Sequence, residues 1–341
     1  MKIQCHKIAS VTHRVGLTPE VEISRIIEPR MGTVLVVRAL EEKRVYDLLE
    51  LASGRQAHIS KGDVIAGALG ARAALRGFVG RVPEKLAAGD RIHVLNLGGV
   101  LGECTSGTSD VGHPLLVEVL GMAVRDGKPL NIRDDALPAA ERLDLKEPVI
   151  FVSGTCMNSG KTRAAVEIIF HLTQRGYRVG AAKLTGVACL KDTLNMIDHG
   201  AVAGLSFLDC GLPTTSDVEG LPAVAKGILN ALAAREVDVV VAEAGDGVIG
   251  HYGVRSLLED GEIRAATRCH VVTANDLVGA WGAKRILEGE LGLKIGVMAG
   301  PATDNEVGVR YVEEELRIPA ANARIQGERL SDLVEAQTFA P

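Results

Sequence analysis

Aromatic side chains and positive net charge are both scarce in this chain of 341 residues. It has five phenylalanines, four tyrosines and one tryptophan, which are too few for a series of base-stacking platforms. Its 43 acidic residues outnumber its 38 basic residues and give a net charge of −5, so no overall positive field attracts a phosphate polymer or an anionic bilayer. We therefore expect neither a nucleic-acid partner nor a membrane partner.

Long apolar runs and closely spaced cysteines are also missing. No apolar run approaches the roughly 20 residues of a membrane helix, and the first residues lead into no signal-type hydrophobic stretch. We therefore expect a cytoplasmic protein. The six cysteines include no Cys-x-x-Cys pair and no dense spacing, which predicts reduced, mostly buried thiols.

The chain is long enough for about two domains, and its two halves differ in pattern. From residue 32 to residue 133, short β-branched stretches are broken by glycine, which predicts a mostly β domain over residues 1–140, either a barrel or a sandwich. Asp126 and Gly127 predict a tight hairpin after a strand over residues 115–124. One helix is expected inside this half, from Ala39 to Leu51, where leucines recur at near-helical spacing.

The second half begins after a charged, proline-bearing connection over residues 133–148. Apolar strands are expected at residues 149–152, 178–183 and 237–241, separated by helical patterns such as the one from Thr162 to about Arg175. Continuously apolar strands alternating with helices predict an α/β domain over residues 148–341, with a buried parallel sheet.

The most specific signal is the segment at residues 153–162, between an apolar strand and an amphipathic helix. In a phosphate-binding loop, glycines let main-chain N–H groups turn toward phosphate oxygens, and Lys161 and the helix N-terminus add positive charge. The hydroxyl of Thr162 would hold Mg²⁺. The predicted nucleotide contacts are Gly154, Thr155, Asn158, Ser159, Gly160, Lys161, Thr162 and Arg163.

Two ionisable residues stand where apolar strands end. Lys183 ends the second strand of this half, and Glu243 ends the third. Ligands of open α/β sheets bind beyond the carboxyl ends of the strands, so both side chains are expected to face the crevice of the phosphate loop. An acid such as Glu243 can bind Mg²⁺ directly or through water.

Residues 148–323 resemble dethiobiotin synthetase and its relatives, a branch of the P-loop proteins. The resemblance lies in the lengthened loop from Gly154 to Thr162, in the stretch from Arg175 to Lys183, and in the strand that ends at Glu243. It implies that Lys183 helps to bind phosphate and substrate and that Glu243 is a magnesium ligand. It also implies a second metal-binding aspartate, to which Asp192 corresponds loosely and for which Asp198 is the alternative. Relatives often pair across their nucleotide sites, so it also implies a homodimer.

The base of the nucleotide is left open. Asn275 and Asp276 resemble the strand-end element with which GTPases bind guanine, but Ala274 stands where that element has lysine. ATP and GTP therefore both remain candidates. Cys156 and Met157 replace acidic and hydroxyl residues of the dethiobiotin family, which argues against diaminopelargonate as the substrate.

Three functions follow from these patterns. The first is a Mg²⁺-dependent, ATP-using ligase or phosphotransferase that activates a small carboxylate, with Lys161 and Lys183 as catalytic residues. The second is a coenzyme A-dependent N-acyltransferase, because the loop also resembles that of a P-loop family that includes a D-glutamate N-acetyltransferase. The third is a nucleotide-switched binding protein, such as a metal-delivery GTPase.

Overall fold

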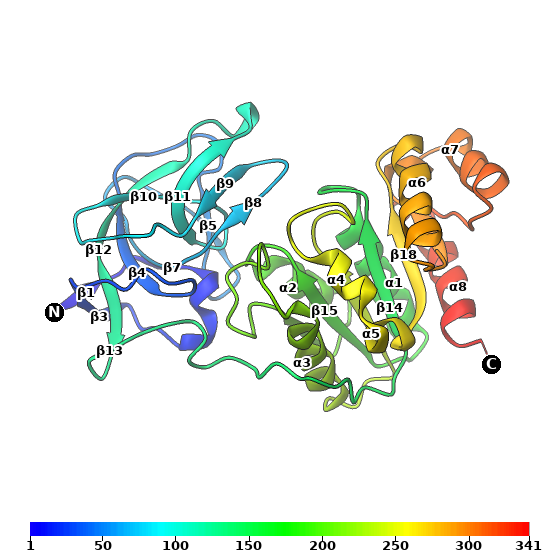
Figure 1. The fold of residues 1–341 in the computed structure, drawn as a ribbon, viewed down its shortest axis with the longest axis horizontal. Coiled ribbons are helices and arrows are strands. Elements are labelled where there is room, and N and C mark those ends of the chain that lie inside the picture. The colour runs from blue at the N-terminus through cyan, green and yellow to red at the C-terminus, as the bar shows by residue number, and fades with distance from the viewer. Residues whose placement is uncertain (341) are drawn as a thin grey trace. The chain divides into compact units, whose positions relative to one another are not determined.

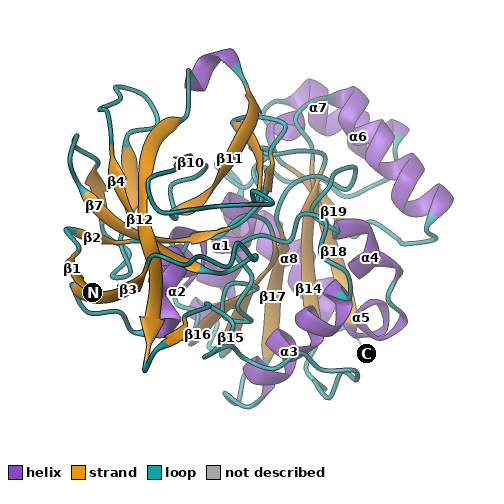
Figure 2. Cartoon of the chain, turned by 60° about the vertical axis from the view of Figure 1, so that its left-hand side comes forward, coloured by secondary structure: helices purple, strands orange, loops and turns teal. Residues whose placement is uncertain are grey.

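The computed structural model describes residues 1–340, which form two compact units (Figure 1). The first unit comprises Met1–Leu137, Val187–Lys191 and Phe207–Ser216, and the second comprises the rest of the described chain. Figure 2 shows that strands dominate the first unit, whereas helices flank the strands of the second. This agrees with the predicted fold class of a mostly β part followed by an α/β part.

An eleven-stranded, mostly antiparallel sheet forms the first unit. Its main path is β1-β3-β12-β4-β7-β11-β9-β8, with β2, β10 and β13 pairing beside that path, and β5 and β6 form a separate pair. The strands are β1 (Lys2–Gln4), β2 (Lys7–Ile8), β3 (Glu20–Ser24), β4 (Val34–Ala39), β5 (Leu48–Glu50), β6 (Gln56–His58), β7 (Val64–Leu69), β8 (Arg72–Ala73), β9 (Phe78–Arg81), β10 (Arg91–Val94), β11 (Val100–Gly107), β12 (Leu115–Arg125) and β13 (Lys128–Pro129). Two short 3₁₀ helices complete it, η1 (Ser10–Val15) and η2 (Ser109–Val111).

The predicted hairpin is present at the end of β12. Arg125 pairs with Lys128, and the two residues between them, Asp126 and Gly127, have φ angles of 53° and 74°. Two successive left-handed residues match the right-handed twist of the flanking strands, which is why Asp-Gly is favoured there.

The helix predicted from Ala39 to Leu51 is wrong. Ala39 ends β4, and Leu48–Glu50 form β5, which pairs antiparallel with β6. Tyr46 has a φ of 60°, which a right-handed helix cannot contain. Glu50 is fully buried and accepts hydrogen bonds from the main-chain N–H groups of Leu190 and Lys191, at 2.6 and 2.7 Å. Tertiary hydrogen bonding therefore overrides the local helical spacing.

A six-stranded, all-parallel sheet forms the centre of the second unit, as predicted, in the order β16-β15-β17-β14-β18-β19. The strands are β14 (Val149–Gly154), β15 (Val179–Thr185), β16 (Ala203–Ser206), β17 (Val239–Ala244), β18 (Thr267–Thr273) and β19 (Val297–Ala299). The helices are α1 (Lys161–Gln174), α2 (Lys191–Asp198), α3 (Leu221–Ala233), α4 (Val254–Glu259), α5 (Gly261–Ala266), α6 (Leu277–Lys284), η3 (Arg285–Glu290), η4 (Pro301–Thr303), α7 (Glu306–Arg310), η5 (Tyr311–Glu315) and α8 (Gly327–Thr338).

Helix α1 follows the predicted pattern. Its residues Ala165, Ile168, Ile169 and Leu172 are fully buried in one apolar cluster with β14, β18 and α8, because positions i, i+3, i+4 and i+7 share one helix face. Gly176, with a φ of 93°, follows its end in the left-handed conformation expected of a helix stop.

The strand order changes direction at β14. The chain runs from β14 to β15 on one side of it and later crosses to β18 on the other. In open α/β sheets, ligands bind beyond the carboxyl ends of the strands at such a point. Gly154, the last residue of β14, is the first residue of the predicted phosphate loop, so the loop begins there.

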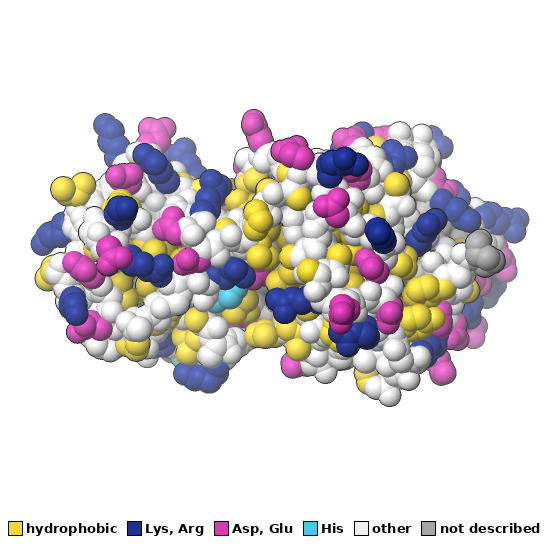
Figure 3. Space-filling view, turned by 90° about the horizontal axis from the view of Figure 1, so that it is seen from below, with side chains coloured by type: hydrophobic (Ala, Val, Ile, Leu, Met, Phe, Trp, Pro, Cys, Tyr) yellow, Lys and Arg dark blue, Asp and Glu magenta, His cyan; other side chains and the backbone are white. Residues whose placement is uncertain are grey.

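Neither the surface charges nor the cysteines point to a particular function. On the face shown in Figure 3, acidic and basic side chains are interspersed. Within residues 1–340 every helix is too short or too polar to cross a bilayer. No disulfide joins the cysteines of this described part, where Cys5 and Cys269 are buried and the other four are half-buried, so burial is less general than predicted.

Candidate functional site

The loop between β14 and α1 is a tight turn around a small space. Asn158 and Gly160 have φ angles of 61° and 96°, and the left-handed backbone of Gly160 is one that glycine adopts without strain. A Cβ atom on Gly154 would collide with the hydroxyl oxygens of Ser159 and Thr273, which lie 2.7 Å from each other. The loop therefore needs glycine at Gly154 to close against β18.

Main-chain N–H groups of this loop are open. From residue 156 to residue 160, none donates a hydrogen bond to any atom of residues 1–340. A run of open N–H groups at a helix N-terminus suits an anion such as phosphate.

Lys161 places its ammonium group over the same loop. Its Nζ donates to the carbonyl oxygen of Cys156 at 2.7 Å and lies 3.5 Å from Ser159 Oγ. The side chain is almost fully buried, and this burial lowers the pKa of Lys161 to about 8. The amine is thus held where phosphate oxygens would enter, and an incoming anion would favour its charged form.

Thr162 and Glu243 meet beside the loop. Thr162 Oγ1 donates to Glu243 Oε1 at 3.0 Å, and the other carboxylate oxygen, Oε2, is buried without a hydrogen-bond partner in residues 1–340. An orphaned carboxylate oxygen next to a hydroxyl is a donor set that suits a hard divalent cation. These two residues fit the Mg²⁺ ion that the sequence implies and would hold it, where it would supply positive charge to phosphate oxygens.

Lys183 lies between two carboxylates. Its Nζ is 2.5 Å from Glu243 Oε1 and 3.0 Å from Asp192 Oδ2, and its side chain is almost completely buried. Burial alone would lower the pKa of Lys183, but Asp192 and Glu243 raise it above its ordinary value. Lys183, Glu243 and Asp192 therefore lie together, and two carboxylates share the one positive charge of the lysine.

Three other predicted nucleotide contacts have different partners in this structure. Asn275 donates from Nδ2 to the sulfur of Cys156 at 2.9 Å, so it does reach the loop. Asp276 caps α6, accepting a hydrogen bond from Gly279 N at 2.7 Å. Arg163 is half-exposed and forms an ion pair with Glu167 at 2.5 Å, one helical turn along α1. Their roles toward a base stay predictions.

Asp246 is a candidate site residue that the sequence analysis did not single out. It follows β17 with a φ of 70°, a strained backbone for a non-glycine residue. Burial raises its pKa, which the nearby positive charge of Lys161 opposes. Strained, buried acids cluster at functional sites. The sequence could have indicated this residue, because it is an acid between Gly245 and Gly247 just beyond a buried strand.

The parallel sheet, the loop at the end of β14, the buried lysine and the helix that follows are those of a P-loop NTPase fold. No family model and no curated protein matches the chain.

Among solved structures, the chain is similar to the signal recognition particle receptor FtsY from Elizabethkingia anophelis, with 13% identity, a TM-score of 0.36, and coverage of 61% of this chain and 75% of that one. It is also similar to a DUF1611 family protein from Anabaena variabilis, with 14% identity, a TM-score of 0.42, and coverage of 59% and 63%. A third is the signal recognition particle 54 kDa protein from Aeropyrum pernix K1 in complex with GDP, with 17% identity, a TM-score of 0.38, and coverage of 56% and 48%. Likenesses this distant carry no argument about activity, so the function must be inferred from the chain's own residues.

Proposed function

We propose that the second unit binds a nucleoside triphosphate together with Mg²⁺ and transfers the terminal phosphoryl group to a small carboxylate. The observation that carries the proposal is the open run of loop N–H groups from residue 156 to residue 160, with the ammonium group of Lys161 above it. Main-chain donors and a lysine in this arrangement suit a polyphosphate better than a single carboxylate, because several anionic oxygens are satisfied together.

The residues around the loop would have different roles in binding and catalysis. The loop N–H groups and Lys161 would bind phosphate oxygens, while Thr162 and Glu243 would hold Mg²⁺. Phosphoryl transfer needs positioning and neutralisation of charge more than covalent help from the protein. Lys183 would serve this need by fixing the orientation of the Glu243 carboxylate through their 2.5 Å contact.

The choice of ATP and of a carboxylate acceptor rests on the resemblance to dethiobiotin synthetase. The guanine-reading element lacks its lysine, since Ala274 stands in that place, and Asp276 already caps α6. Both points favour ATP over GTP. Coenzyme A, which would place its phosphates on the same loop N–H groups, is the competing ligand.

A thermal-shift comparison tests the proposal. The full chain is heated with ATP, GTP or coenzyme A, each with and without Mg²⁺, and the variant Lys161→Ala is compared with Lys146→Ala, which removes an exposed lysine of the same unit. Because a ligand that binds only the folded state raises its melting temperature, we expect the largest rise with ATP and Mg²⁺. Lys146→Ala should keep that rise and Lys161→Ala should lose it.

Four results would contradict the proposal. A rise with coenzyme A alone that does not need Mg²⁺ would favour the acyltransferase, and GTP preference would favour the nucleotide switch. No Mg²⁺-dependent rise with any nucleotide, or an unchanged rise in Lys161→Ala, would remove the proposed role of the loop.

A further inference from the structure

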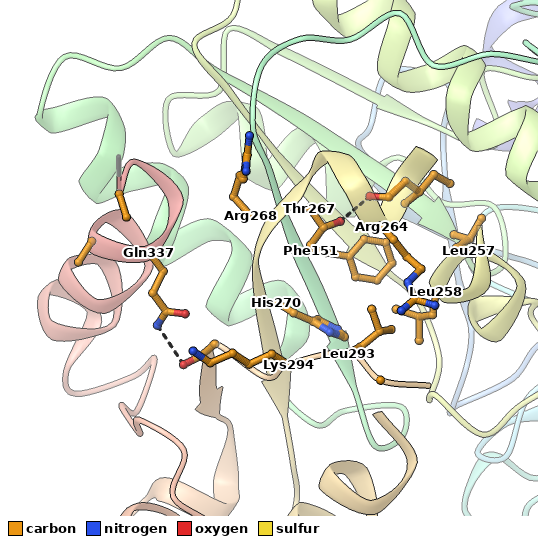
Figure 4. Close-up of a pocket in the computed structure, with 15 residues that line it drawn as sticks. Phe151, Leu257, Leu258, Arg264, Thr267, Arg268, His270, Leu293, Lys294 and Gln337 are labelled. Atoms are coloured by element: carbon orange, nitrogen blue, oxygen red, sulfur yellow. Dashed lines mark hydrogen bonds between the residues drawn. The ribbon is translucent and has the colours of Figure 1, made fainter. Parts of the chain in front are cut away.

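A second cavity of about 430 Å³ lies in the second unit, apart from the phosphate loop (Figure 4). Its walls come from the first halves of β14 and β18, from α4 and α5, from residues 292–296 and from the end of α8. No residue of the loop from 154 to 162 lines it. A volume of this size is in the range of small-molecule sites.

Apolar side chains, one histidine and the polar side chains of Thr267 and Gln337 line the cavity beside its cations. Phe151, Leu257, Leu258 and Leu293 provide hydrocarbon surface, and the His270 ring meets Phe151 edge to face at 5.4 Å between centroids. In Figure 4 the His270 ring lies beside Leu293, with Arg264 and Lys294 on opposite sides of it. Such a wall accommodates a compact apolar body.

His270 is a polar group placed to contact a ligand. The residue is only 5% exposed, and its one side-chain hydrogen bond within residues 1–340 joins Nε2 to Ser153 Oγ at 2.8 Å. Burial lowers the pKa of His270 to about 4, so the ring is neutral. If the Ser153 hydroxyl donates to Nε2, the other nitrogen, Nδ1, carries the proton and can donate to an anion.

The rim of the cavity is positively charged. Arg264, Arg268 and Lys294 are exposed lining residues, no lining residue is acidic, and none of the three cations forms an ion pair within residues 1–340. Arg264 donates to a main-chain carbonyl, that of Leu291, at 3.1 Å.

The nearest acids in the sequence have other partners. Glu262 is 2.7 Å from the ammonium group of Lys226, and Glu290 is 3.5 Å from the guanidinium group of Arg255. The rim cations therefore remain available to a ligand's charge.

From these observations, the geometry points to a binding site for a small organic monocarboxylate with an aryl or branched alkyl body. The apolar body would lie on Phe151 and Leu293, while the carboxylate would accept a hydrogen bond from His270 and gain from the positive charge of the rim, to which Lys294 contributes. This site is separate from the nucleotide site and does not depend on the proposed function.

Phenylacetate and its neutral counterpart phenylacetamide test the site, because they share a body and differ in charge. Binding to the full chain is measured by isothermal titration and by ligand-observed NMR. We expect phenylacetate to bind with a Kd of about 1 mM or below, and phenylacetamide to bind about fivefold more weakly.

Two variants and a control locate the binding. Lys294→Met should weaken phenylacetate about fivefold and leave phenylacetamide unchanged, whereas Leu293→Trp should abolish both by filling the cavity. Arg310→Met, which removes an exposed cation outside the lining, should change neither. Lys294 is exposed, so its variant is expected to fold even if Leu293→Trp does not.

The inference is overturned by any of three results. These are equal affinity for the acid and the amide, no saturable binding of phenylacetate at concentrations of about 10 mM, and unchanged phenylacetate affinity in Lys294→Met. The imidazole ¹⁵N signals of His270 give an independent check, because binding at this site must shift them and binding elsewhere must not.

Discussion

Replacing Lys183 with methionine should destabilise the second unit strongly. Methionine keeps most of the apolar stem of the lysine but removes the ammonium group that contacts Glu243 and Asp192 at 2.5 and 3.0 Å. The Glu243 side chain is only 1% exposed, so water cannot replace the lost partner. The variant must therefore bury a carboxylate that has lost its charged partner.

The expected loss follows from what such pairs cost when one partner is removed. Truncating one member of a buried ion pair typically costs about 3–5 kcal/mol, whereas an exposed pair contributes about 1 kcal/mol or less. Because the carboxylates raise the pKa of Lys183 above its ordinary value, the lysine is fully charged at neutral pH and its whole contribution is present there. We therefore expect a loss in the free energy of unfolding of about 4 kcal/mol at pH 7.

Urea denaturation can measure this loss in the relevant unit. Trp281 is the only tryptophan of the chain and lies in α6 of the second unit, so its fluorescence reports on that unit. With an m-value of about 2 kcal/mol/M, the midpoint should fall by about 2 M, and the control Lys146→Met should not move it.

A second variant separates an electrostatic effect from a packing effect. Adding Glu243→Gln to Lys183→Met should recover part of the loss, since the amide carries no charge. A loss below about 1 kcal/mol, or no recovery in the double variant, would refute the reasoning.

Three further predictions concern the loop and the buried histidine. Burial lowers the pKa of Lys161 to about 8, so the affinity for ATP should fall as the pH rises from 7 to 9. Binding near pH 8 should also take up protons. Titration calorimetry in buffers of different ionisation enthalpy would detect this uptake. Gly154→Ala should weaken ATP binding at least about tenfold, because the alanine Cβ would collide with Ser159 and Thr273. An unchanged affinity would contradict this prediction and show that the loop can relax. Burial lowers the pKa of His270 to about 4, below its value in the unfolded chain. The contribution of the neutral ring to stability is therefore present above about pH 6.5 and lost as the pH falls toward 4. In urea titrations His270→Asn should flatten this decline in stability, and an equal decline in both proteins would contradict the prediction.

The parts of the fold that the sequence predicts are those decided locally. Helix α1 is predicted because its apolar residues share one face, and the hairpin at Asp126 and Gly127 because two left-handed residues suit such a turn. The failed helix over residues 39–51 shows the limit of this reasoning. There Glu50 accepts hydrogen bonds from residues 190 and 191, far along the chain, and no local period reports such a contact.

The candidate site also has a part that the sequence predicts and a part that it does not. Four residues could be proposed from sequence because each stands near the end of a strand or at the start of a helix, where the topology fixes the direction of the backbone: Lys161, Thr162, Lys183 and Glu243. Their partners could not be predicted, since the contact between Lys183 and Asp192 depends on how α2 packs beyond β15.

A residue of a functional motif can also make a local structural contact. Asp276 stands three residues before Gly279 and caps α6, and Arg163 stands four residues before Glu167 and pairs with it. Capping and the i, i+4 spacing would have predicted both contacts from sequence.

The charges at the loop explain why a metal ion and a nucleotide should bind together. Around the loop, two lysines, Lys161 and Lys183, face three carboxylates, those of Glu243, Asp192 and Asp246. A triphosphate that entered alone would add several negative charges beside these acids, and two lysines cannot offset them at the low dielectric of a buried site. A divalent cation held by Thr162 and Glu243 would change that balance, because it engages the carboxylate oxygen that has no partner within residues 1–340. The same residues that attract the cation therefore repel the free nucleotide, and this opposition makes the comparison with and without Mg²⁺ the most informative arm of the thermal-shift experiment.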